Sequence, residues 1–143
     1  MEPLSFASRP PRGPREKVAG IMLTARVIDK LRASLPGGEP NGYVPYAGMS
    51  AVWAHYTKID LSELCHVVER AASEAEVEAW IEARTAQLDK PKINQKLEGF
   101  ETARMPEELR PLFEQLYPAE LRERYSLVFD LLEADDARVY SVP

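Results

Sequence analysis

The stretch from Arg12 to Leu35 constrains the fold more than any other, because it joins a basic loop to an amphipathic helix with a defined start and end. Thr24 is the predicted N-cap, since a threonine hydroxyl accepts a hydrogen bond from the free amides of a first helical turn. Pro36-Gly37-Gly38 ends the helix, because neither residue type continues it. Between these limits, apolar residues recur at the helical spacing and form one buried stripe: Val27, Ile28, Leu31 and Leu35.

The opposite face of this helix carries Arg26, Asp29 and Lys30. The commoner arrangement of such residues is a solvated face with weak ion pairs, each worth about 0.2–0.5 kcal/mol, and this is the expectation. A central helix in a small domain is covered on both faces, however, and the same three side chains would then line a pocket. The residues themselves leave both arrangements open.

Three stretches carry a family resemblance: PRGPREK (11–17), ARVIDKLRA (25–33) and FDLLEADD (129–136). They resemble the bacterial domain-of-unknown-function family numbered 5069. The resemblance covers both ends of the chain and its middle only loosely. It implies a compact helical domain of the cytosol, and it implies no particular chemistry.

The rest of the chain has the pattern of short helices separated by Pro- and Gly-containing breaks. Asp60 and Ser73 are predicted to start two of them, since each is followed three residues later by a glutamate, as in a capping box. No segment alternates between apolar and polar residues, so no sheet is expected. The predicted fold is all-α: a compact single-domain bundle of about six short helices over residues 12–143, preceded by a mobile or draped arm over residues 1–11.

The last predicted helix begins near Tyr125 and ends in the acidic cluster 133–136. Negative charge at a helix C-terminus opposes the helix dipole. We therefore expect cations nearby, and the basic loop supplies the candidates Arg12, Arg15 and Lys17.

Composition and charge argue against several classes of protein. The 143 residues are 45% apolar and 29% charged, which is ordinary for one globular domain. The net charge of −5 argues against nucleic acid as a partner. A single cysteine, Cys65, allows no internal disulfide and no cysteine metal cluster. Because there is also no signal peptide and no apolar run of membrane-spanning length, a cytoplasmic location without membrane contact is expected.

The middle of the chain has the composition most typical of a ligand site, because aromatic residues gather there around one histidine: Tyr43, Tyr46, Met49, Trp53, His55 and Tyr56. The commoner explanation is that these large side chains close a small core and keep their polar ends in water. A pocket for an aromatic or planar ligand would need the same residue types. Both explanations stay open.

Proton transfer by side chains is the chemistry that remains. The sequence contains no Gly-rich phosphate loop, no nucleophile elbow and no His/Cys set at metal-ligand spacing, so neither a metal nor another cofactor is expected. His55, Tyr46 and Lys30 are the candidate catalytic residues, with His55 preferred because imidazole titrates near neutral pH. His66 is expected to be solvated and dispensable. The candidate substrate-binding residues are Tyr43, Trp53, Tyr56, Arg26 and Asp29.

Two classes of function follow. We favour a small-molecule-binding helical protein, acting as a cofactor-independent lyase or isomerase on a small aromatic or anionic substrate. The alternative is a non-catalytic helical module that binds a protein partner. A concave pocket with convergent polar groups would indicate the first class, and a flat apolar patch of several hundred Å² the second. The oligomeric state stays open.

Overall fold

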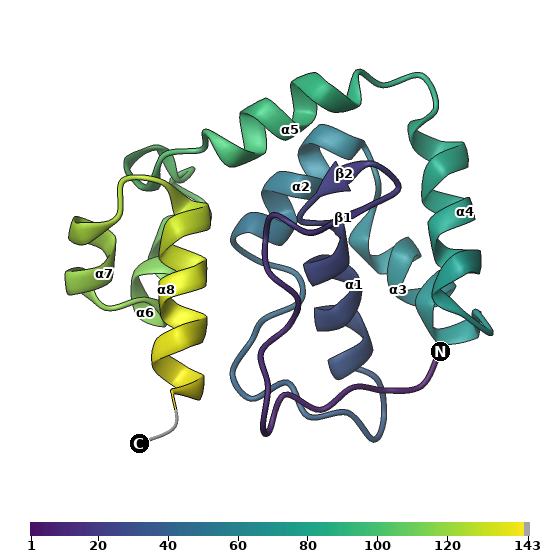
Figure 1. Cartoon of the computed structure of the whole chain (residues 1–143), viewed down its shortest axis with the longest axis horizontal. Helices are drawn as coiled ribbons and strands as arrows, with labels where there is room; N and C mark the ends of the chain where they lie inside the picture. Colours follow the sequence, from purple (N-terminus) through teal and green to yellow (C-terminus); the bar gives the residue numbers. More distant parts are fainter. Residues whose placement is uncertain (142–143) are drawn as a thin grey trace.

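A computed structural model describes residues 1–141, and over this range the chain is a mostly helical domain, as predicted. Within residues 1–141 eight α-helices are present rather than about six: α1 (Thr24–Ala33), α2 (Met49–Thr57), α3 (Leu61–Arg70), α4 (Glu74–Thr85), α5 (Lys90–Glu98), α6 (Arg110–Leu116), α7 (Ala119–Arg124) and α8 (Val128–Tyr140). Figure 1 shows α1 in the middle of the molecule, with α3 and α4 on one side and α8, α6 and α7 on the other. Helix α5 links the two sides.

Helix α1 is buried on both faces. Arg26 and Asp29 are only 3% and 2% exposed, so the expectation of a solvated polar face was wrong for these two residues. The physical reason is that α8 and the N-terminal segment cover this face and supply opposite charges to both side chains. A helix enclosed in this way can hold functional groups out of bulk water.

The start of α1 also differs from the prediction. The cap position is Leu23, in a left-handed conformation with φ 71°, and Thr24 is the first helical residue. The Thr24 hydroxyl instead accepts a hydrogen bond from Trp53 Nε1 at 2.9 Å. A buried indole N–H needs an acceptor, and this bond ties α2 to α1.

A small hairpin precedes α1, although no sheet was expected. Strands β1 (Lys17–Val18) and β2 (Ile21–Met22) pair antiparallel, and both turn residues, Ala19 and Gly20, have positive φ. Such φ values match the twist of a two-residue hairpin. Strands of two residues are too short to show alternation, which explains why the sequence pattern did not predict them.

Of the two predicted helix N-caps, at Asp60 and Ser73, only the first forms its side-chain hydrogen bond. The Asp60 carboxylate accepts from the Glu63 N–H at 3.1 Å, as the predicted cap requires. The side chain of Ser73 makes no cap bond, and the Glu76 carboxylate accepts from the Ala72 N–H instead. Neither bond of a capping box forms at Ser73, because the Glu76 carboxylate bonds the N–H of the residue before the cap.

Helix α8 continues to Tyr140, so the acidic cluster 133–136 lies in its middle and not at its C-terminal end. The argument from the helix dipole therefore does not apply. Asp135 and Asp136 are buried, at 7% and 8% exposure, because they face the interior of the domain. They are part of the candidate site.

Residues 1–11 drape over the outside of the domain. Phe6 is completely buried, and the backbone N–H groups of Phe6 and Glu39 pair this arm with the segment after α1. The arm therefore holds the end of α1 and the following loop together.

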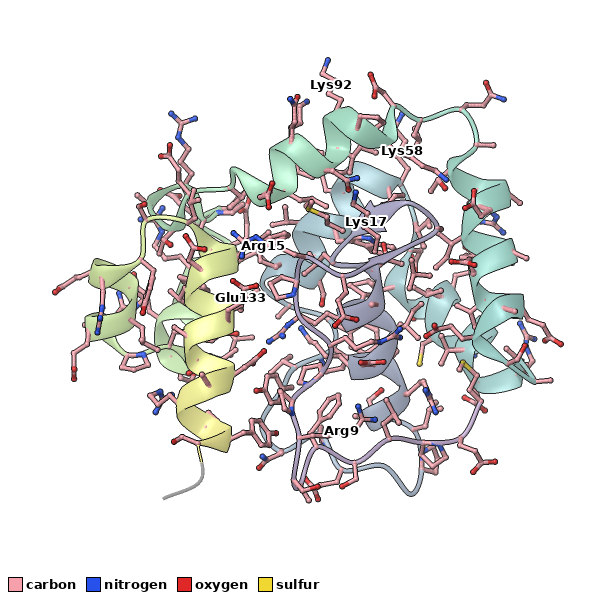
Figure 2. All side chains as sticks on the ribbon, viewed as in Figure 1. Arg9, Arg15, Lys17, Lys58, Lys92 and Glu133 are labelled. Carbon is pink, nitrogen blue, oxygen red and sulfur yellow. The ribbon has the colours of Figure 1, made fainter. Side chains whose placement is uncertain are left out.

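The two arginines of the basic loop after the arm bind different groups of carboxylates. Arg15 reaches Glu133, as predicted, and also Glu98 and Asp130, each at 3.0 Å. Figure 2 shows Arg15 and Glu133 pointing toward one another. Arg12 instead binds Asp29 and Glu74, and Lys17 forms no ion pair with any residue in the described range. One arginine thus joins α5 to α8.

Replacing Arg15 by glutamine should lower the free energy of unfolding by about 1–2 kcal/mol, because three partly exposed pairs of up to about 1 kcal/mol each are lost. The loss should shrink in high salt, since these groups are open to screening. Urea denaturation of both proteins at low and high salt measures it. Arg9→Gln is the control, because Arg9 is exposed and lies away from this cluster in Figure 2; an equal loss in both variants would contradict the role of Arg15.

Candidate functional site

A cavity of about 280 Å³ lies between α1, the loop 41–48, the start of α2, and helices α6 and α8. It opens where the two sides of the molecule meet. Its polar lining includes side chains from α1, the loop 41–48, α2, the end of α6 and α8: Arg26, Lys30, Tyr43, Ser50, Tyr117, Asp135 and Arg138. Apolar side chains of α6 and α8 complete the wall.

A buried ion pair holds Arg26 in place in the wall of the cavity. The two Nη atoms of Arg26 donate to the two carboxylate oxygens of Asp136 at 2.7 and 3.0 Å. The Tyr43 hydroxyl donates to the same carboxylate at 2.8 Å, and the Tyr43 ring lies against the Arg26 guanidinium. Burial, followed by the charge of Asp136 and this hydrogen bond, raises the pKa of Tyr43. Tyr43 therefore stays protonated at neutral pH.

Lys30 lies one helical turn after Arg26 on the same face of α1. Its Nζ donates to Ser50 Oγ at 2.9 Å, and no carboxylate within residues 1–141 pairs with it. Burial and then the positive charge of Arg26 lower the pKa of Lys30 to about 7, although Asp136 acts in the opposite direction. Lys30 is therefore an amine that both gains and loses a proton near neutral pH.

Two further groups face the cavity from the C-terminal helices. Burial raises the pKa of Tyr117 to about 12; its hydroxyl makes no hydrogen bond within the described chain and is still open to solvent, because no described side-chain polar atom is both buried and without a partner. Arg138 donates to Asp135 at 2.6 Å, and its side chain is 54% exposed at the rim. The site thus combines an unpaired phenol, a lysine and an accessible guanidinium.

The sequence model of one family, described as Domain of unknown function (DUF5069), matches residues 8–138. The chain belongs to this family. A search of the curated proteins finds no match to it. The matched range contains every polar residue that lines the cavity. The polar part of the site therefore lies within the family's own domain.

Three of the candidate site residues predicted from the sequence line this cavity: Arg26, Lys30 and Tyr43. Met49 from the aromatic cluster also lines it. The expectation that α1 could contribute the polar lining of a pocket holds for the two cations. Asp29 points the other way and binds Arg12.

The other indicated residues lie outside the cavity. His55 is exposed and packs edge-on against Tyr56, whose ring also meets Lys96. Trp53 is completely buried in the core. Tyr46 is 48% exposed, and a hydrogen bond with Cys65, then burial, raise its pKa to about 12. The structure therefore separates most of the aromatic cluster from the polar site.

No sequence pattern indicated five further residues of the site: Ser50, Tyr117, Asp135, Asp136 and Arg138. The two aspartates lie in FDLLEADD (129–136), one of the stretches that resemble the family, but they were interpreted as a helix end. Ser50 and Tyr117 carried no signal, because neither lies in a motif. Their role follows only from the approach of α2 and α6 to α1.

Two negative findings apply to the described residues. Among them, no three His, Cys, Asp or Glu side chains gather closely enough to hold a metal ion. No helix within residues 1–141 is both long and apolar enough to cross a membrane.

Proposed function

We propose that this protein binds a small anionic molecule in the cavity between α1, α2, α6 and α8 and performs cofactor-independent proton transfer on it, with Lys30 as the acid–base group. The observation that carries the proposal is the Lys30 amine, held by Ser50 at 2.9 Å beside Arg26 and without a carboxylate partner among the described residues. A group with a pKa of about 7 is the most effective acid or base at neutral pH. A lyase or isomerase reaction needs no more than such a group and a bound substrate.

The surroundings of Lys30 support an anionic ligand of small size. Arg138 lies at the rim and keeps donors free for a carboxylate, since a guanidinium carries five N–H groups. The unpaired Tyr117 hydroxyl can donate to an oxygen that gains charge during the reaction. A volume of about 280 Å³ is near the lower end for ligand pockets.

The interaction-module alternative has less support. It requires a contiguous apolar patch on the surface, yet Tyr46 and Val139 are the large apolar side chains exposed within residues 1–141. They belong to different segments of the chain. The cavity with convergent polar groups favours ligand binding.

Lys30 should titrate with a pKa of about 7, because of its burial and the charge of Arg26. The measurement is an NMR titration of the lysine side-chain amines, with Lys30→Arg used to assign the signal. Removing the neighbouring hydroxyl in Ser50→Ala is a second test, since Ser50 accepts the only hydrogen bond that Lys30 Nζ donates within residues 1–141. A Lys30 signal that titrates only above pH 9 would refute the acid–base role.

The same pKa predicts how stability depends on pH. Between pH 7 and 10.5 the unfolded chain holds a proton on Lys30 that the native state has lost, so the free energy of unfolding rises with pH in this window. The slope is at most about 1.4 kcal/mol per pH unit. Denaturation of the parent and of Lys30→Met across this range checks it; a parallel pH dependence of both proteins would contradict the shift.

Binding itself is tested by thermal-shift and NMR measurements with a panel of small carboxylates and phenolates. Arg138→Gln should weaken binding of the active compounds by about tenfold, because a rim cation is lost. His55→Ala is the matched control and should bind like the parent, since His55 lies outside the cavity. No binding by any member of the panel, or equal loss in both variants, would overturn the proposal.

A further inference from the structure

Lys30 has a second property that proton transfer alone does not require: its amine forms no ion pair with any carboxylate of residues 1–141. Asp136, whose charge acts on Lys30, is shared by Arg26 and Tyr43. Asp29, the neighbour of Lys30 in sequence, is turned toward Arg12. A desolvated lysine beside another cation is the arrangement that activates an amine as a nucleophile.

The groups around the amine match the parts of one class of substrate. Ser50 Oγ lies at 2.9 Å from Nζ and can pass a proton to or from it. The Tyr117 hydroxyl, which stays protonated and unpaired within the described chain, is a donor for a carbonyl oxygen. At the rim, Arg138 donates one N–H to Asp135, and its other N–H groups can donate to a carboxylate.

We propose that Lys30 forms an imine with the carbonyl carbon of a small oxo acid, whose carboxylate is bound by Arg138. This inference rests on the proposed function and names its substrate class. The cavity suits such a molecule, since a volume of about 150 Å³ already holds a benzene ring and about 280 Å³ is present. Oxo acids from pyruvate to phenylpyruvate are therefore of suitable size.

The reaction balances without an oxidant, a reductant or a cofactor. The lone pair of the neutral Nζ attacks the carbonyl carbon, the π electrons move to oxygen, and this oxygen takes a proton while nitrogen loses one. The hydroxyl then takes a second proton, the carbon–oxygen bond breaks and water leaves, while the nitrogen lone pair completes the C=N bond and the nitrogen keeps its remaining proton. The imine, once protonated, withdraws electrons from the adjacent carbon, which loses a proton more readily. Reprotonation of that carbon and attack of water on C=N release the product and return the amine.

Reductive trapping tests this directly. The intact protein is incubated separately with glyoxylate, pyruvate and phenylpyruvate and with sodium cyanoborohydride at pH 7, and the site of reduction is mapped by peptide mass spectrometry. At least one of these probes should label Lys30 about 100-fold faster than the exposed Lys58 and Lys92, since a solvated lysine is neutral in only about one molecule in 2,000 at this pH. Figure 2 shows Lys92 on the outer side of α5.

Two variants sharpen the result. Lys30→Arg keeps the charge but cannot form an imine, so labelling at this position should vanish while helical content by circular dichroism is unchanged. Arg138→Gln should raise the half-saturating concentration of pyruvate about tenfold and leave the labelling by acetaldehyde, which has no carboxylate, unaltered.

The outcomes separate the inference from the proposal beneath it. Labelling of the parent at equal rates on Lys30, Lys58 and Lys92 by all three oxo acids would overturn imine formation. If NMR then still shows small carboxylates bound in the cavity, binding and proton transfer stand without the imine. If no carboxylate binds either, both fail.

Discussion

Replacing Arg26 by methionine should lower the free energy of unfolding by about 3–5 kcal/mol, the range for breaking a buried ion pair. Arg26 and Asp136 are 3% and 8% exposed and share two hydrogen bonds. Without the guanidinium, the Tyr43 hydroxyl is the only hydrogen-bond donor left to the Asp136 carboxylate within residues 1–141. Urea denaturation of the two proteins at neutral pH measures the difference.

The double variant Arg26→Met/Asp136→Leu separates charge from shape. Two apolar side chains in place of the pair leave no charge buried, so most of the lost stability should return. Arg138→Met is the matched single control, because its side chain is 54% exposed and an exposed pair contributes at most about 1 kcal/mol. A loss below 1 kcal/mol in Arg26→Met would show that water reaches Asp136.

Trp53→Ala should lower the free energy of unfolding by a similar amount, about 3–5 kcal/mol. Trp53 has no exposed surface, and its indole N–H donates to the Thr24 hydroxyl at 2.9 Å. The substitution therefore opens a cavity between α1 and α2. Thermal and urea denaturation followed by circular dichroism give the value.

Two further variants test the origin of this loss. Trp53→Phe keeps most of the volume but removes the hydrogen bond, and should lose about 1–3 kcal/mol. Trp80 is the second of the two tryptophans; it is half-buried under the Arg84 guanidinium, so Trp80→Ala should lose less than Trp53→Ala. Retention of full stability in Trp53→Ala would return this residue to the list of candidate ligand contacts.

Arg26 and Trp53 also show where sequence patterns stop being sufficient. Both were candidate substrate-binding residues. The structure places Arg26 in the wall of the cavity and Trp53 in the core. An arginine on the polar face of a helix and an aromatic residue on an apolar face look alike in both settings, because the pattern states which face a residue occupies and not what covers that face.

Local interactions made much of the fold predictable from the sequence. The apolar stripe of α1, the Asp60 cap and the absence of long alternating segments each depend on residues within a few positions of one another. The same holds for the family resemblance at both ends, which the match over residues 8–138 confirms. Such signals need no knowledge of the tertiary structure.

The site was decided only by tertiary structure. Lys30, Ser50, Tyr117 and Arg138 are distant in sequence, and they meet because α2, α6 and α8 close around one face of α1. The same closure buries Arg26 against Asp136, 110 positions away, and it leaves His55 on the outer surface. Burial and charge then set the pKa of Lys30. By itself the sequence determined which side chains were available; their depth and their neighbours, which control their chemistry, depend on long-range packing.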